Sequence, residues 1–313
     1  MNIRHGLAFA IVAALAACSN EAPPADTAAA PAPPAETAPA AAPAPAADPI
    51  DAILAGAHRS DENKARDPYR HPKETLAFFG ITPNMTVIEI TPGGGAWYTE
   101  ILAPYLRESG KLIAATWDTS AADAPAYYAR NNETLKAKLA ADPALYDRVE
   151  LRSFDTKAPK FGESNSADAV VTFRNVHNWT GSGVDGAYFQ AFFDALKPGG
   201  VLGVVEHRAN PGTTLEQTKE SGYLTEDYVI GLATAAGFVL EEKSEVNANP
   251  KDTKDHPEGV WTLPPSFALK EVDREKYAAI GESDRMTLRF RKPSELGDGE
   301  APAEAAAQPA TGG

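Results

Sequence analysis

The sequence predicts a doubly wound α/β domain built on a mostly parallel, seven-stranded sheet with an antiparallel last strand. Three observations support this prediction. Apolar, β-rich runs alternate with helix-like segments, a glycine-rich turn follows the first run, and the last run alternates apolar and polar residues. Near-continuous apolar strands separated by helices indicate a parallel sheet that is covered on both faces. The alternating last run suits an antiparallel strand beside the others.

Seven runs have the composition of strands, and they lie at 86–91, 111–116, 149–154, 168–173, 201–206, 238–246 and 286–291. Helices are expected between the earlier strands and before Gly237, at 96–106, 124–140, 185–196 and 225–236. Ligands of doubly wound sheets bind beyond the carboxyl ends of the strands. We therefore expect the site residues directly after the first five strands.

The first 18 residues have the pattern of an export signal. Arg4 and His5 precede an apolar run that is shorter than a transmembrane helix usually requires. The run ends in the sequence LAAC at 15–18, which resembles the lipobox of bacterial lipoproteins. This resemblance implies that Cys18 is lipidated and that the exported chain is anchored on the periplasmic side of the cell envelope. An ordinary signal peptide with a nearby buried cysteine is the alternative.

Two further segments cannot bury enough apolar surface to form a folded structure. Residues 19–48 are almost entirely Ala and Pro with a few acids, and 294–313 form an acidic tail, so we expect a disordered tether and a disordered tail. Residues 49–293 remain as a single domain. Cys18 is the only cysteine in the chain. An intramolecular disulfide or a multi-cysteine metal site is therefore excluded.

The chain is acidic, with a formal net charge of −14. The tether and the tail carry −4 each and Arg4 carries +1, so residues 49–293 carry −7. Such a surface argues against nucleic acid and anionic membrane as partners. We expect contact with a membrane through the lipid anchor alone.

The turn after the first strand reads TPGGGAWYT at 91–99. A phosphate-binding loop would place a Lys and a Ser or Thr directly after the glycines, and this chain has no Lys there. A dinucleotide-binding turn would follow G-x-G-x-x-G, and adjacent glycines do not fit that spacing. The two commonest nucleotide-binding turns are therefore excluded.

Glu89 within the strand, followed by this turn, resembles the first motif of class I S-adenosylmethionine-dependent methyltransferases, an acid, one spacer and G-x-G-x-G. Thr91, Gly93 and Gly95 take the three glycine positions, so a threonine replaces the first glycine. Four later stretches resemble motifs of the same family in the same order: NSADAV at 165–170, FRNV at 173–176, LKPGGV at 196–201 and AGF at 236–238. Stretches at 59–74 and 283–293 are similar to a group of exported bacterial predicted methyltransferases.

The resemblance implies S-adenosyl-L-methionine as the cofactor. The residues that it places around the cofactor are Glu89, Thr91, Gly93, Gly95, Asp118, Asp155, Arg174 and Asn175. Asp155 follows the third strand, where family members hold the adenine amino group. The ribose-binding acid would fall at Thr116, and the nearest acid, Asp118, lies two positions later. An ordinary surface aspartate is the alternative reading of Asp118.

His177 is the predicted catalytic base. It follows the fourth strand, and the pKa of histidine lies near working pH. The alternative is a histidine that only hydrogen-bonds the loop backbone. A metal site made of His177, Glu206 and His207 would also lie at this edge, but no local ligand spacing supports it. We therefore expect no metal.

Aromatic and basic residues near the same edge are predicted to contact the substrate. Trp179 could offer an apolar or cation-attracting wall at this rim. Tyr98 could face a bound sulfonium, although it could equally pack against the sheet. His207 follows the fifth strand, and His256 and Trp261 lie in a long irregular stretch at 247–265, a type of loop that often binds ligands. Arginines in the segment 57–74 could bind an anionic substrate, or form a solvated helix face with ion pairs.

Two functions follow from these patterns. The first is S-adenosylmethionine-dependent methyl transfer to a small molecule or an envelope component. The second is a non-catalytic, methyltransferase-like lipoprotein that binds a ligand. A methyltransferase requires Glu89, Gly93, Gly95 and Asp155 to converge on one cleft of adenosine size.

Overall fold

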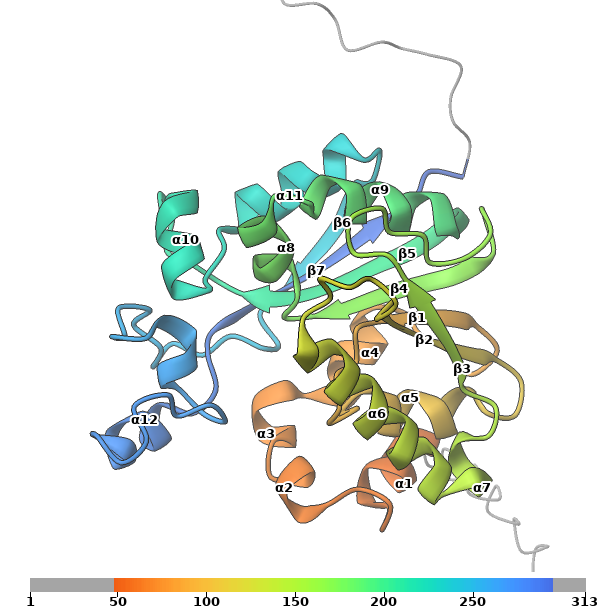
Figure 1. Ribbon diagram of the computed structural model, residues 1–313, viewed down its shortest axis with the longest axis horizontal. Helices are drawn as coiled ribbons and strands as arrows, with labels where there is room; N and C mark the ends of the chain where they lie inside the picture. The colour runs from red at the N-terminus through yellow and green to blue at the C-terminus, as the bar shows by residue number, and fades with distance from the viewer. Residues whose placement is uncertain (1–47, 295–313) are drawn as a thin grey trace, which may run out of the picture. The chain divides into compact units, whose positions relative to one another are not determined.

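The computed structural model describes residues 48–294. These residues form a seven-stranded sheet in the order β3-β2-β1-β4-β5-β7-β6, in which β7 runs antiparallel to both of its neighbours (Figure 1). The strands are β1 (Thr86–Ile90), β2 (Lys111–Trp117), β3 (Glu150–Phe154), β4 (Ala167–Phe173), β5 (Leu196–His207), β6 (Val239–Ser244) and β7 (Arg285–Arg291). The predicted fold class and the antiparallel last strand are both confirmed.

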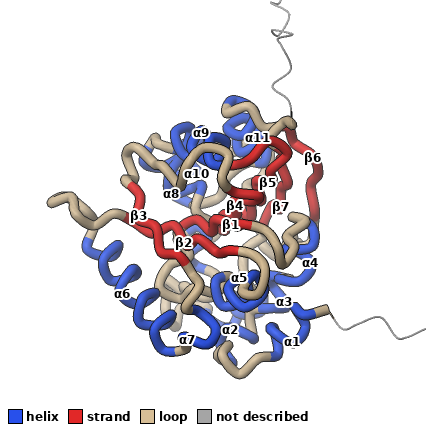
Figure 2. Tube along the Cα trace, turned by 90° about the vertical axis from the view of Figure 1, so that its right-hand side faces the viewer, coloured by secondary structure: helices blue, strands red, loops and turns tan. Residues whose placement is uncertain are grey.

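Helices cover both faces of the sheet (Figure 2). One face carries α1 (Pro49–Ala55), α2 (Asp61–Lys64), α3 (Asp67–Arg70), α4 (Pro72–Phe78), α5 (Thr99–Leu106), α6 (Ala126–Ala141) and α7 (Pro143–Tyr146). The other carries α8 (Val176–Ser182), α9 (Asp185–Ala195), α10 (Leu215–Ser221) and α11 (Glu226–Ala235). A 3₁₀ helix, η1 (Gly259–Thr262), and α12 (Arg274–Ile280) lie beyond β6 in the chain.

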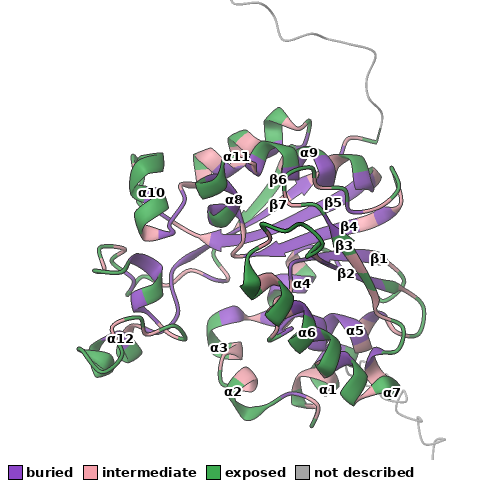
Figure 3. Ribbon diagram, in the orientation of Figure 1, coloured by how far each residue is buried: buried purple, intermediate pink, exposed green. Residues whose placement is uncertain are grey.

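The two faces have separate apolar cores because successive side chains of a strand point to opposite sides. In β1, Ile88 and Ile90 pack with the aromatic residues of α9, whereas Val87 packs with α4 and α5. The central strands are accordingly buried almost throughout, and the helices expose their outer surfaces (Figure 3). This two-sided burial explains why the strands read as near-continuous apolar runs.

The chain switches direction between β1 and β4, which are neighbours in the sheet while β2 and β3 extend to one side. Such a switch point leaves a crevice at the carboxyl ends of the strands. Asn175, directly after β4, donates hydrogen bonds to the Ile90 carbonyl (3.1 Å) and the Thr172 hydroxyl (3.2 Å). It therefore ties the ends of β1 and β4 together at the crevice.

Some details differ from the expectations. The helix expected at 185–196 ends at Ala195, because Leu196 already pairs with Ala167 as the first residue of β5. The short helices α8 and α10 lie in segments that the hydrophobic pattern left without an element. Cys18, the export signal and nearly all of the tether and tail lie outside the described residues. Within residues 48–294, no helix combines the length and apolar character required to cross a bilayer.

Candidate functional site

The turn after β1 has the backbone shape expected of a ligand-binding turn. Gly93 has φ +68°, a left-handed conformation that glycine adopts without strain. Thr91 is also left-handed, at φ +44°, which is unusual for a β-branched residue. This geometry explains why the related motif carries glycine at that position. The buried Thr91 hydroxyl has no hydrogen-bond partner among the described residues, and left-handed strain of this kind concentrates at functional sites.

A cleft of about 770 Å³ opens beside this turn. The predicted residues that line it are Thr91, Gly93, Arg174, Asn175 and Trp179. Its outer wall is aromatic, with the rings of Trp117 and Tyr128 stacked at 4.7 Å and 5°. The volume lies within the range of small-molecule and cofactor sites. An unpaired hydroxyl, a glycine turn and flat aromatic walls fit an adenosyl cofactor.

Four of the predicted cofactor residues do not line this cleft. Glu89 is buried beneath the turn, where its carboxyl accepts a hydrogen bond from the Thr99 hydroxyl (2.7 Å) and where burial raises its pKa to about 7. Asp118 and Asp155 are instead exposed and cap their own loops, accepting from the backbone N–H groups two residues later. Gly95 lies outside the lining as well.

Sequence reasoning missed Asp123, which is the acid among the residues that line this cleft. It pairs with Lys157 across the opening (2.8 Å), and both side chains are largely exposed. The acid lies seven residues beyond Thr116, in the loop between β2 and α6, so the spacing of the family motif gives no signal for it. Trp117 and Tyr128 were missed as well, because the family motifs give no signal for them. Their rings meet only through the fold of the loop between β2 and α6.

A second cavity of about 350 Å³ adjoins the cleft, and Arg174 and Asn178 line both. The predicted residues His177, His207 and Trp261 also line it. They come from three separate parts of the chain: α8 after β4, the end of β5, and η1. The structure therefore places the predicted base and two of the predicted substrate residues around one space.

Two other predicted substrate residues lie elsewhere. Tyr98 is buried, with its ring stacked on Phe173 at 3.5 Å and 8°, which matches the packing alternative. His256 lines a different cavity of about 400 Å³ and bonds through Nε2 to the Asp252 carboxyl at 2.8 Å. The irregular stretch 247–265 thus contributes Trp261 to the second cavity while His256 faces another one.

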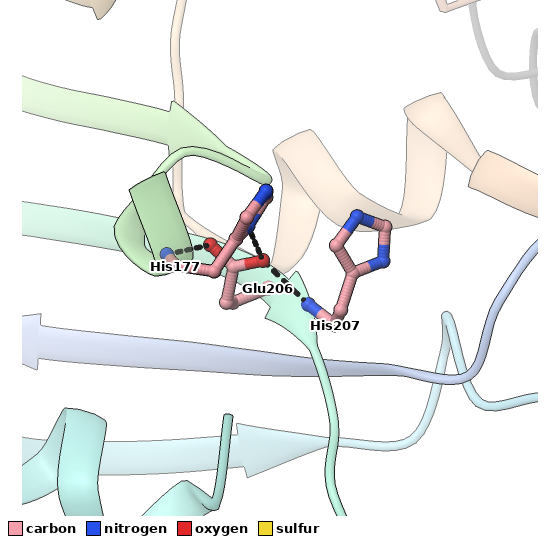
Figure 4. Close-up of side chains that lie close together, drawn as sticks. All are labelled: His177, Glu206 and His207. Carbon is pink, nitrogen blue, oxygen red and sulfur yellow. Dashed lines mark hydrogen bonds and ion pairs between the residues drawn. The ribbon is translucent and has the colours of Figure 1, made fainter. Parts of the chain in front are cut away.

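The buried carboxyl of Glu206 organises the histidines (Figure 4). One oxygen, Oε2, accepts from the backbone N–H groups of Val176 (2.6 Å) and His177 (3.3 Å) at the start of α8. The other, Oε1, accepts from the backbone N–H of His207 (2.8 Å) and lies 2.9 Å from His177 Nδ1. Three of these contacts come from backbone N–H donors, so Glu206 acts as the acceptor, and we assign the proton of the fourth contact to Nδ1 of His177. In the tautomer that carries its proton on Nδ1, Nε2 is the acceptor.

His207 is held by a different partner. Its Nδ1 lies 2.6 Å from the Ser283 hydroxyl, and its ring centroid lies 5.2 Å from that of His177. Burial holds the pKa of His207 well below its usual range, and the proximity of His177 and of the guanidinium groups of Arg174, Arg285 and Arg70 lowers it further. His207 is therefore neutral at working pH.

The ligand atoms of His177, Glu206 and His207 lie within 4.8 Å of one another, close enough to hold a metal ion. The expectation of no metal rested on the absence of a local spacing, and here β4 and β5 bring the three together as neighbouring strands. However, each oxygen of Glu206 already has two N–H partners. The surrounding arginines further disfavour a cation.

Two of the three arginines of the segment 57–74, Arg59 and Arg70, are buried, so the expectation of a solvated helix face is wrong for them. Arg59 is 2% exposed and pairs with Asp67 (2.7 Å) and Glu100 (3.0 Å). Arg70 is 1% exposed and pairs with Glu282. The sequence pattern could not reveal Glu100 or Glu282 as partners, because they lie 41 and 212 residues away.

Comparison with solved structures agrees with this topology. The chain aligns with the [4+2]-cyclase SpnF at 17% identity and a TM-score of 0.53, covering 79% of this chain and 93% of SpnF. It also aligns with a SAM-dependent methyltransferase from Aquifex aeolicus, at 17% identity and a TM-score of 0.47 over 73% and 93% of the two chains. An arsenic(III) S-adenosylmethionine methyltransferase from Chlamydomonas reinhardtii aligns at 14% identity and a TM-score of 0.49, over 79% and 74%.

No family model and no curated protein matches the chain. The sheet order and the alignment with SpnF confirm the predicted Rossmann-like fold. At these identities the likeness shows the fold alone, and the function has to be argued from the site.

Proposed function

We propose that the protein transfers a methyl group from S-adenosyl-L-methionine to a small molecule or an envelope component. The observation that carries this proposal is the pair of adjoining cavities at the carboxyl ends of the strands, which share Arg174 and Asn178. The larger cavity fits the cofactor beside the glycine turn. The smaller one, next to His177, is then the place of the methyl acceptor.

When bound, the cofactor would supply an electrophilic methyl group to a nucleophile aligned with the carbon–sulfur bond, with the neutral thioether S-adenosylhomocysteine as the leaving group. Alignment of two bound molecules in adjoining cavities can provide much of such a rate enhancement. Thr91 and Gly93 would hold the cofactor at the turn, and the rings of Trp117 and Tyr128 would enclose its adenosyl part.

His177 would take the proton that an acceptor hydroxyl or amine loses. Glu206 fixes the proton of the imidazole on Nδ1 and so keeps Nε2 free to accept another. The same carboxylate binds the first N–H groups of α8, which sets the position of the helix that carries His177. Glu206 is therefore a positioning residue.

For location, we propose a lipoprotein anchored through Cys18 on the periplasmic side of the cell envelope, as in the exported bacterial methyltransferases that the sequence resembles. This assignment rests on the LAAC sequence at 15–18 and the short apolar run before it. Its support is independent of the fold.

A non-catalytic ligand-binding lipoprotein is the second candidate. It is favoured by the outward orientation of Asp118 and Asp155, the two acids expected to hold ribose and adenine. The fold is also compatible with other chemistry, since a structural neighbour is described as a [4+2]-cyclase. In that case the cleft would bind a ligand and Asp155→Ala would leave its affinity unchanged.

The two candidates can be separated by a label-transfer assay. The full-length protein is incubated with S-adenosylmethionine labelled in the methyl group and with an extract of envelope and small molecules. We expect labelled product with the natural protein and a loss of about 100-fold or more with His177→Gln, since general bases contribute roughly that much. Equal labelling by both proteins would remove His177 from the mechanism.

A further inference from the structure

The smaller cavity carries more positive charge than the surrounding protein neutralises. Arg66, Arg70 and Arg174 line it, and Arg285 lies behind them at the start of β7. Glu282 is the carboxylate shared by this group. Its oxygens lie 2.6 Å from Arg66 Nε, 3.1 Å from Arg70 Nε and 2.8 Å from Arg285 Nη2. Three guanidinium groups thus pair with one carboxylate, and Arg174 adds a fourth positive charge nearby.

The guanidinium groups also have hydrogen-bonding capacity left over. Within residues 48–294, the buried Nη1 atoms of Arg70 and Arg174 have no hydrogen-bond partner. Burial, together with the neighbouring arginines, lowers the pKa of Arg174 to about 10. An unpaired buried donor on a charged group is strongly unfavourable unless a ligand supplies the acceptor.

We propose that this cavity binds an oxyanion, a carboxylate or a phosphate, carried by the methyl acceptor. This inference rests on the proposed function and names its substrate class. Guanidinium groups bind carboxylate and phosphate oxygens through paired, charge-assisted hydrogen bonds. Arg70 and Arg174 offer such donors within one cavity, and Arg66 adds a third positive charge at its rim.

The remaining wall of the cavity indicates the rest of the molecule. Val260, Trp261, Pro264 and Pro265 give the cavity an apolar surface. A ligand that combines one oxyanion with a small apolar or aromatic body satisfies both surfaces. Such an acceptor would also lie against His177, whose ring centroid is 6.1 Å from that of Trp261.

The proposal can be tested by calorimetric titration of the full-length protein with benzoate, phenyl phosphate and the uncharged control benzamide. We expect benzoate or phenyl phosphate to bind and benzamide not to bind. The tighter of the two anions identifies the oxyanion as carboxylate or phosphate.

Arg174→Gln should weaken anion binding by about 10- to 100-fold, the loss typical of a charge-assisted hydrogen bond. Arg66→Gln should also weaken it, and it provides a second variant at a partly exposed side chain. The matched control is Arg148→Gln, because Arg148 is exposed and precedes β3 at the opposite edge of the sheet. Thermal unfolding confirms that each variant is folded.

Three results would overturn the proposal: benzamide binding as tightly as benzoate, Arg148→Gln weakening the anions as much as Arg174→Gln, or no anion binding at all. A fourth would reassign the arginines to the cofactor's own carboxylate. In that case Arg66→Gln and Arg174→Gln weaken binding of S-adenosylhomocysteine and leave benzoate unaffected. The proposed methyl transfer is tested separately. Absence of S-adenosylhomocysteine binding by the natural protein would contradict it, whatever the result with the anions.

Discussion

Replacing Glu206 with glutamine should destabilise the fold and also move a proton on His177. The carboxyl accepts four N–H bonds of 2.6 to 3.3 Å, two at each oxygen. A glutamine side chain offers a single acceptor oxygen, and its NH₂ group must face N–H donors on the other side. Placed toward Val176, the NH₂ group displaces two backbone bonds. Placed toward His207, it displaces one.

The second orientation is therefore favoured, and it has a chemical consequence. The NH₂ group then donates to His177 Nδ1, which must give up its proton, and the proton moves to Nε2. A ring protonated on Nε2 cannot accept a proton from the acceptor molecule. The variant should lose methyl transfer while keeping its cofactor cleft, which lies on the far side of Arg174 and Asn178.

The magnitude follows from the bonds lost. One buried backbone N–H is left without an acceptor, and the remaining bonds lose the carboxylate charge, for a total of about 2–4 kcal/mol. Urea unfolding of the full-length protein measures this difference. Glu133→Gln is the matched control, because Glu133 is exposed and forms a surface pair worth less than about 1 kcal/mol. An unfolding free energy of Glu206→Gln within about 0.5 kcal/mol of the natural protein would show that the four bonds to the carboxylate do not stabilise the fold.

Three further predictions concern the sheet and the cleft. Burial raises the pKa of Glu89 from 4.5 in the unfolded chain to about 7 in the folded protein. Between these two pH values the folded protein holds the proton more tightly than the unfolded chain does. The unfolding free energy therefore falls by about 1.4 kcal/mol per pH unit as pH rises through this window, roughly 3 kcal/mol in all. Glu89→Gln should remove this dependence in urea unfolding at about pH 5 and about pH 8, and identical slopes for both proteins would contradict it. Gly203→Ala places a Cβ 2.6 Å from the Phe79 ring and should lower the unfolding free energy by about 1–3 kcal/mol, whereas Gly181→Ala meets no atom within 4 Å and should not lower it. Trp117→Ala opens the aromatic wall and should weaken S-adenosylhomocysteine binding about tenfold in calorimetry; unchanged affinity would show that the ring does not contact the ligand.

The sheet could be predicted because its strands are buried on both faces and so keep a local signature. Seven apolar runs were enough to place every strand of the described domain within a few residues, except that β5 begins five residues earlier, at Leu196. The helix α8 was missed, since its short sequence VHNWTGS has no apolar repeat and its first N–H groups are bound by the distant Glu206. Its position depends on a contact that no local pattern encodes.

The site was predictable in its location and not in its contacts. His177 and His207 were expected at one edge because their strands end there, and the structure places them around one cavity. Arg70 was expected to bind an anion or to face solvent, and its burial against Glu282 depends on β7 starting at the same edge. Asp118 and Asp155 lie after the expected strands, but short loop turns direct their carboxyls to their own backbone.

Calorimetric titration of the full-length protein with S-adenosylhomocysteine tests the central claim most directly. We expect affinity on the order of micromolar. It should be lost in Gly93→Val, because valine does not tolerate φ +68° at the cleft, and kept in Gly181→Ala. Absence of both heat and any thermal shift at millimolar ligand would contradict it. The cleft beside the glycine turn would then hold a different molecule.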